Sequence, residues 1–349
     1  MDGTQEHAAA APTGRRVTRR RPALWGTLCR GRCGRSRTAQ RRRFSWRNGR
    51  VTAAAAVVVA CLLALPSAVP NTPGRLGSLM ETFLPWLGLV VPVLLAVAVL
   101  RRSRTALLAL LLPAVAWLGQ FGALLLPAQG AAHDLVVVQH NVSDTNTDPE
   151  ATARALVRIS PDLIALEEVT ESARPRYREA LAAHHPHHAV AGTVGLWSRF
   201  PLSDIRPLDI KPAGIGPGWN RALRATARTP QGEIAVYVAH LPSVRLGVNG
   251  LDSAWRDESA LLLGAAIAAE PLDRVILLGD LNSTVDDRGL RPVSSQMNPT
   301  GPGFAFSWPA AFPVARIDQV MTRSATVTSL FSLPATGSDH LPVAARVRF

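Results

Sequence analysis

The stretch "DRVILLGDLNST", residues 273–284, decides the fold expected for this 349-residue chain. Four consecutive apolar residues, from Val275 to Leu278, predict a strand that is buried on both faces. Asp280 and Asn282 follow at the point where that strand stops. An acid and an amide at such a place are common in turns, so the stretch becomes informative only if other strands end in the same way.

Other strand-like stretches do end in the same way. Asn141 ends "DLVVVQHNV", Glu168 lies at the end of "PDLIALEEVT", and His240 follows "VYVA". The remaining polar candidates are Asp318 in "RIDQV", and Asp339 with His340 just before the last strand-like stretch. Because strand ends at one edge of a sheet converge in space, these side chains are expected to share one pocket.

Helical patterns separate several of these strands. "DPEATARALVRIS" is expected to form a helix with Asp148 as its N-cap and Pro149 at its first position. A second amphipathic helix is expected in "SAWRDESALLLGAAIAAE". Residues 134–349 are numerous enough for one domain, and the pattern favours an α/β fold with a mixed sheet, or two packed sheets, and flanking helices.

Charge divides the chain into two parts. Residues 1–133 hold 18 arginines and three acids, whereas residues 134–349 hold 20 basic and 22 acidic residues. The net charge of +13 therefore belongs to the front part, where residues 1–50 are expected to form a disordered, basic, cytoplasmic arm. Residues 134–349 have no basic excess for a nucleic-acid backbone, so nucleic acid is not the leading expectation for the partner.

Three apolar stretches fill residues 51–127, beginning at Val51, Phe83 and Ala106. Each is about long enough to cross the roughly 30 Å hydrocarbon layer, so we expect three transmembrane helices. The first, which is rich in alanine, also fits a late signal-like segment. Arginines in the arm and in "RRSR", residues 101–104, are expected to stay inside. The chain is therefore expected to be a multi-pass protein of the cell membrane with residues 134–349 outside the cytoplasm.

The residue types at the strand ends restrict the chemistry. They are acids, amides and imidazoles, and residues 134–349 contain no cysteine. Hard oxygen ligands with few imidazoles favour Mg²⁺ or Mn²⁺. Such an ion neutralises phosphate oxygens and helps to orient an attacking water. The pattern therefore indicates a metal-dependent enzyme that hydrolyses a phosphoester.

Eight motifs in order resemble the endonuclease/exonuclease/phosphatase superfamily, which has the DNase I-like fold. They are "QHNV", "PDLIALEEV", "GLWSRFPL", "VYVAHL", "LLGDLN", "FSWP", "RIDQV" and "GSDHLPV". The resemblance covers residues 134–349 and implies a four-layered α/β sandwich, in which two sheets pack face to face with helices outside.

The resemblance also implies a role for each candidate residue around the metal and the water. Asn141 and Glu168 would help to hold the divalent metal, and Asp339 would support either the metal or His340. Asp280 would position or deprotonate the attacking water.

The remaining candidates would act on the phosphate. Asn282 and His240 would bind it, and Asp318 would orient His340 toward the scissile phosphate. Arg221 and Arg224 both fit the family's basic phosphate-binding position, and Arg221 is preferred.

The superfamily does not fix the substrate. The apolar stretches, the short domain and the motifs "YVAHLPSVR" and "PATGSDHLPVAARV" look similar to VanJ-type membrane proteins linked to teicoplanin resistance. That similarity implies a phosphorylated lipid substrate, such as undecaprenyl diphosphate. An extracytoplasmic metal-dependent endonuclease and a phospholipid phosphodiesterase are the alternatives. A non-catalytic membrane interaction protein is disfavoured because every expected ligand type is present.

Overall fold

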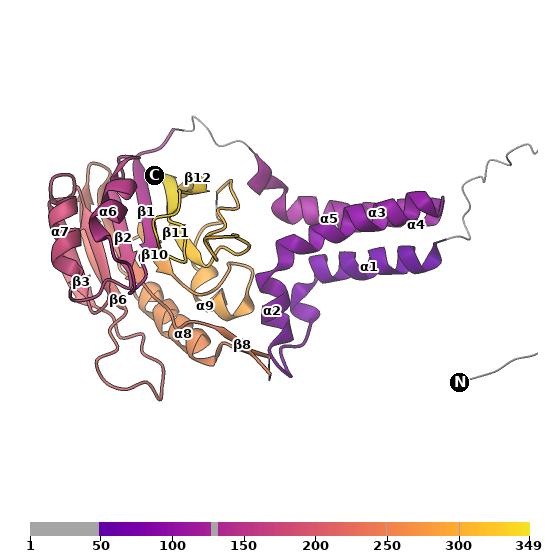
Figure 1. Cartoon of the computed structure of the whole chain (residues 1–349), viewed down its shortest axis with the longest axis horizontal. Helices are drawn as coiled ribbons and strands as arrows, with labels where there is room; N and C mark the ends of the chain where they lie inside the picture. Colours follow the sequence, from indigo (N-terminus) through magenta and orange to yellow (C-terminus); the bar gives the residue numbers. More distant parts are fainter. Residues whose placement is uncertain (1–48, 127–131, 249, 300) are drawn as a thin grey trace, which may run out of the picture. The chain divides into compact units, whose positions relative to one another are not determined.

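The computed structural model of the chain describes residues 49–126, 132–248, 250–299 and 301–349 (Figure 1). These described residues belong to one compact unit. The expected disordered arm, residues 1–50, falls almost entirely outside the described residues.

Two mixed sheets form the domain that begins after residue 132. The strand order is β12-β13-β1-β2-β4-β3 in the first sheet and β11-β10-β7-β6-β5 in the second. β1 and β2 are parallel, as are β7 and β10, and the other neighbours in both sheets are antiparallel. The strands of the first sheet are β1 (Leu135–Asn141), β2 (Leu163–Glu167), β3 (His187–Ala191), β4 (Val194–Ser198), β12 (Thr326–Ser332) and β13 (Val343–Arg348). Those of the second sheet are β5 (Leu202–Pro207), β6 (Ala222–Thr229), β7 (Gly232–Ala239), β10 (Val275–Asp280) and β11 (Asp318–Arg323). A small hairpin is formed by β8 (Arg245–Gly247) and β9 (Gly250–Asp252).

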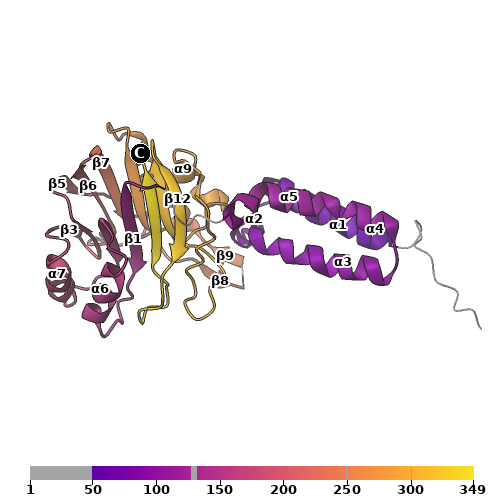
Figure 2. The same ribbon diagram turned by 90° about the horizontal axis from the view of Figure 1, so that it is seen from above.

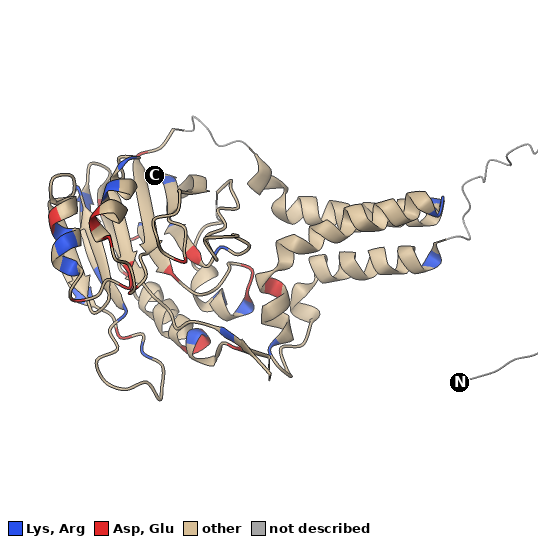
Figure 3. Ribbon diagram, in the orientation of Figure 1, with Lys and Arg blue, Asp and Glu red and all other residues tan. Residues whose placement is uncertain are grey.

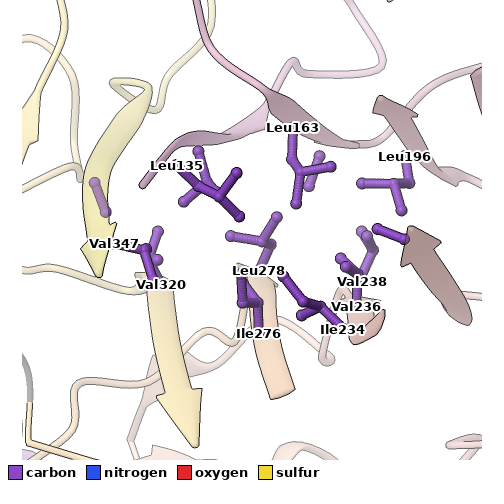
Figure 4. Close-up of a cluster of buried hydrophobic side chains, with 14 of the residues drawn as sticks. Leu135, Leu163, Leu196, Ile234, Val236, Val238, Ile276, Leu278, Val320 and Val347 are labelled. Carbon is purple, nitrogen blue, oxygen red and sulfur yellow. The ribbon is translucent and has the colours of Figure 1, made fainter. Parts of the chain in front are cut away.

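The main core lies between the two sheets. Apolar side chains from alternate positions of the strands meet there, as Figure 4 shows for Leu135 and Leu163 of the first sheet and Ile276, Leu278 and Val320 of the second. Alternate residues of a strand point to opposite faces, so one set fills this core and the other faces the helices.

Helices cover the outer faces of both sheets. α6 (Pro149–Val157) and α7 (Arg174–Ala182) pack on the first sheet and lie together in both views (Figure 1 and Figure 2). α8 (Ala254–Ala268), η4 (Arg288–Leu290) and α9 (Arg291–Ser294) pack on the second. These are the four layers of the expected sandwich. The expected start of α6 is confirmed, because the Asp148 side chain accepts a hydrogen bond from the Ala151 N–H and Pro149 is the first helical residue.

The apolar front part forms helices that differ from the expected spans. They are α1 (Arg50–Ala64), η1 (Pro66–Ala68), α2 (Leu76–Thr82), η2 (Leu84–Leu89), α3 (Val90–Leu100), α4 (Arg104–Ala109), α5 (Leu111–Phe121) and η3 (Gly122–Leu125). In the part of the chain that the structure describes, Arg104–Leu125 is the one helix long and apolar enough to cross a membrane. Leu76–Thr82 with Leu84–Leu100 makes a second only if the pair, bent by 71°, counts as one span.

The expectation of three spans and a multi-pass protein is therefore wrong. Pro66 directly follows Leu65, and a residue before proline is disfavoured in the helical conformation, so α1 stops after 15 residues. The second stretch, which begins at Phe83, forms η2 and α3 over Leu84–Leu100 and passes the length test only together with α2, from which it is bent by 71°.

Candidate active site

The topology brings one edge of both sheets to the same place. Asn141 ends β1, and Glu168 follows β2, which runs parallel to β1. His240 follows β7, and Asp280 ends β10, which runs parallel to β7. Antiparallel strands reach this edge at their starts: β11 begins at Asp318, directly opposite Asp280, and β13 begins three residues after His340.

Asp280 lies at the centre of the cluster. Its Oδ2 accepts a hydrogen bond from Asn141 Nδ2 at 3.0 Å and lies 3.6 Å from His240 Nε2 and 3.8 Å from His340 Nε2. Glu168 joins the same group, because its Oε1 lies 3.2 Å from Asn141 Nδ2 and 3.8 Å from His240 Nε2. Three side chains therefore contact the Asp280 carboxylate, and Glu168 contacts two of those three.

A carboxylate and an imidazole form a close pair beside this centre. His340 Nδ1 lies 2.8 Å from Asp318 Oδ2, and both residues are buried. Gln139 Nε2 donates to the other oxygen of Asp318 at 3.0 Å and to Glu167 Oε2 at 2.7 Å. The Asp318 carboxylate, which orients His340, is thus itself held in place by the hydrogen bond from Gln139.

Two residues of the cluster have left-handed backbone conformations. Glu168 has φ 60° and Asn282 has φ 47°. Residues other than glycine in this region are uncommon, and where they occur the surrounding structure holds them. Asn282 is held by its N–H, which donates to Asp280 Oδ1 at 2.9 Å, and by its Nδ2, which donates to the Leu241 carbonyl at 2.9 Å.

The structure separates the two candidate arginines. Arg221 Nη1 lies 3.3 Å from His240 Nδ1, and the Arg221 guanidinium interacts electrostatically with Glu168 and Asp280. Arg224 is instead buried in an ion pair with Glu270. Arg221 is therefore the arginine at the cluster.

Burial and nearby charges give the two histidines opposite protonation states. Burial lowers the pKa of His240 to about 3, and the guanidinium of Arg221 acts in the same direction, so this imidazole is neutral. Burial also disfavours the charged form of His340, but the carboxylates of Asp318 and Asp280 outweigh it and raise the pKa of His340 to about 10. Burial raises the pKa of Asp280 to about 7.

One group in the described residues has the geometry of a metal site. Single ligand atoms of Asp280, Asp318 and His340 all lie within 4.8 Å of one another, and all three residues are buried. This set differs from the expected ligands Asn141, Glu168 and Asp339. Of those, the first two lie beside Asp280, whereas Asp339 is exposed and its backbone carbonyl accepts the Ala310 N–H.

Sequence reasoning missed the residues that support the cluster. Gln139 and Glu167 lie within strands, and their polarity was the one signal that could have marked them. Ser338 Oγ donates to the Asn141 carbonyl at 2.7 Å and accepts the His340 N–H at 3.0 Å. A serine two residues before the histidine suits such a local turn.

Comparisons with known proteins agree with the fold. The sequence model of the Endonuclease/Exonuclease/phosphatase family matches residues 133–340. No curated protein matches the chain.

Among solved structures, D. rerio TDP2 carrying 14 humanizing mutations is similar, with 18% identity, a TM-score of 0.51, and coverage of 62% of this chain and 99% of that one. The Bacteroides thetaiotaomicron mannosyl-6-phosphatase has 17% identity and a TM-score of 0.50, covering 62% and 100%. At these identities the similarity shows the fold alone. The resemblance to VanJ-type proteins stays a prediction.

Proposed function

Because the chain belongs to the endonuclease/exonuclease/phosphatase family and is a metal-dependent phosphoester hydrolase of that superfamily, we propose that it acts on a phosphorylated lipid at the extracytoplasmic side of the cell membrane. A polyprenyl diphosphate such as undecaprenyl diphosphate is the proposed substrate, with glycopeptide resistance as the proposed setting. The observation that carries the catalytic part is the convergence of Asn141, His240 and His340 on the carboxylate of Asp280.

The residues present suit a divalent cation. Asp280 and Asp318 bring two buried carboxylates close together, and like charges in such a place favour a bound cation. Asn141 and Glu168 add an amide and a third carboxylate at the same place. Mg²⁺ or Mn²⁺ bound among these groups would supply positive charge to phosphate oxygens.

The protein's own groups then divide the remaining work. Asp280, which lies at the centre of the cluster, positions or deprotonates the attacking water. His340, charged and oriented by Asp318, faces the phosphate and offsets the negative charge that grows there. Arg221, Asn282 and neutral His240 bind the remaining phosphate oxygens.

Exposed apolar surface supports the membrane part of the proposal. Most of the large apolar side chains that the described residues expose lie between Val51 and Leu126, including Val93, Val115 and Leu118. Soluble surfaces rarely expose so much apolar side chain in one segment. α3 and α5 contain no charged residue, whereas Figure 3 shows both signs of charge interspersed over the domain with the sheets.

The proposed orientation follows from the charges before the span. Arg101, Arg102 and Arg104 precede or begin Arg104–Leu125, and arginines flanking a span favour the cytoplasmic side. If Arg104–Leu125 begins at the cytoplasmic side, the residues that follow it lie at the outer surface of the membrane. The active site would then face substrates presented by the outer leaflet.

Purified full-length protein in detergent tests the proposal. With Mg²⁺ it should release phosphate from a polyprenyl diphosphate, and chelation by EDTA should abolish that release. D280A and H340A should lose the activity while keeping a cooperative thermal transition. D204A and H184A are matched controls that should remain active, because Asp204 pairs with Arg224 and His184 is exposed.

Other substrates in the same assay decide between the alternatives. Cleavage of plasmid DNA, with no release from any lipid, would establish the endonuclease instead. Release of a phosphorylated head group from phospholipid vesicles would establish the phosphodiesterase. Retained activity in a D280A/H340A double variant would refute the assignment of the site.

A further inference from the structure

A buried arginine outside the catalytic cluster reaches the loop that carries Asn282. Arg256 lies in the first turn of α8 and is 1% exposed. Its Nη1 donates to the Asn282 carbonyl at 3.1 Å, its Nε to Asp257 Oδ1 at 2.7 Å, and its Nη2 to Asp287 Oδ2 at 2.7 Å. A buried guanidinium is costly unless it is paired and hydrogen-bonded, and these three partners satisfy that requirement.

The two carboxylates that hold Arg256 are themselves fixed. Asp287 Oδ1 accepts the Gly289 N–H at 2.9 Å, which caps η4. Asp257 accepts a hydrogen bond from Ser253 Oγ at 3.2 Å and forms an ion pair with Arg75. A planar guanidinium between two anchored acids has one orientation, so its third donor points in a defined direction.

This third donor, Arg256 Nη1, points to the backbone carbonyl of Asn282. The N–H and side chain of Asn282 are already bound to Asp280 and to the Leu241 carbonyl, and Arg256 supplies the third contact, on the carbonyl oxygen. The residue has φ 47°, a conformation that costs on the order of 1–3 kcal/mol unless the surroundings hold it. Without the guanidinium, the Asn282 carbonyl is free to rotate, and the backbone that presents the Asn282 N–H to Asp280 loses one of its three anchors.

We infer that Arg256 is a positioning residue for the reaction: it holds the peptide of Asn282 so that Asp280 and the Asn282 side chain keep their places, without touching the substrate. The inference rests on the proposed function, since it assigns a task to a residue behind the proposed site. Arg256 differs in this respect from Arg221, which lies among the side chains of the cluster itself.

Two independent changes disturb the contact. R256K keeps the positive charge but replaces a planar three-way donor by a single ammonium, which cannot bind Asp257, Asp287 and the Asn282 carbonyl in the same geometry. G289A keeps the Arg256 side chain but puts a Cβ atom against Asp257 Oδ1 and 2.8 Å from Arg256 Nη2, so the Asp257 carboxylate and the guanidinium both have to shift. R224K is the matched control, because Arg224 is also buried between two carboxylates, Glu270 and Asp204, but contacts no residue of the loop.

The experiment measures kcat and KM with Mg²⁺ on whichever substrate the wild-type protein hydrolyses, together with the thermal unfolding midpoint. R256K and G289A should lower kcat on the order of 10- to 100-fold, because small displacements of catalytic groups cost that much, with little change in KM. R224K should lower the unfolding midpoint but leave kcat unchanged at temperatures where the protein is folded.

Chemical rescue separates positioning from general stability. Adding ethylguanidinium to R256A should restore part of kcat, whereas ethylammonium should not, and neither should act on R224A. If R256A does not fold, R256K and G289A decide the matter. Wild-type kcat in both of those variants overturns the inference, and so does a loss of kcat that follows only the unfolded fraction. An inactive wild-type protein, or an active D280A variant, would instead count against the proposed function.

Discussion

Replacing Asp318 by Asn should change the protonation of His340 more than any other single substitution at the site. The carboxylate contacts His340 Nδ1 at 2.8 Å and is the main cause that holds the pKa of His340 near 10 against the effect of burial. In D318N the charge is lost, although an amide oxygen can still accept the hydrogen bond. The pKa of His340 should therefore fall by about one to three pH units.

Nuclear magnetic resonance titration of the histidine ring signals in metal-free, EDTA-treated protein measures this directly. Wild-type His340 should remain charged through neutral pH, and His340 of D318N should lose its proton at a distinctly lower pH. D204N is the control, because Asp204 is an acid of the second sheet that pairs with Arg224. An unchanged His340 titration in D318N would refute the assignment of Asp318 as the orienting carboxylate.

Adding Mg²⁺ to the same samples distinguishes two arrangements of the metal. If His340 is a ligand together with Asp280 and Asp318, its ring must lose a proton when the metal binds, and its titration should move to much lower pH. If the metal is held by Asn141 and Glu168, His340 should keep its proton and face the phosphate. The outcome assigns the imidazole either to the metal or to the substrate.

Three further predictions concern stability and phosphate binding. Hydrogen bonds from Arg224 and Tyr237 outweigh burial and lower the pKa of Glu270 from 4.5 to about 2, so Glu270 stabilises the fold above pH 4.5 and this contribution is lost as the pH falls toward 2. The difference in free energy of unfolding between wild type and E270Q, from urea titrations, should accordingly shrink across that range; a constant difference would contradict the ion pair. L278A should reduce the free energy of unfolding by about 2–5 kcal/mol, because Leu278 lies fully buried between the sheets; a loss below 1 kcal/mol would speak against a close-packed core. Inorganic phosphate should inhibit R221A less strongly than wild type but should inhibit R224K as strongly as wild type, which a competition assay would show.

The cluster around Asp280 could be predicted from the sequence because its members lie at strand ends. A buried strand is visible as an apolar run, and parallel neighbours bring their ends to one edge, so Asn141, Glu168, His240 and Asp280 were placed together without coordinates. The choice between Arg221 and Arg224 needed the structure. Both lie near the start of β6, and only the packing shows that Arg224 pairs with Glu270.

The residues behind the cluster could not be anticipated in the same way. Arg256 lies in a helix whose sequence indicates only an amphipathic pattern, and its contact with Asn282 joins positions 26 residues apart. The number of spans was also predicted wrongly. Apolar composition indicated three spans, but α1 ends just before Pro66 and η2 begins at Leu84, next to Pro85. Apolar composition shows only that a stretch of sequence is hydrophobic. A transmembrane helix also needs a long run of continuous backbone hydrogen bonds, which composition does not reveal.

The distribution of the cluster over both sheets has a consequence for how the activity responds to damage. Asn141, Glu168 and His340 come from segments of the first sheet, and His240, Asp280 and Asp318 from the second. Neither sheet alone carries all the residues of the cluster. Enzymatic activity should therefore come only from molecules in which the two sheets are packed against each other as in the native fold. A molecule in which each sheet is formed but the two sheets are not packed together would keep its secondary structure and yet have no hydrolase activity.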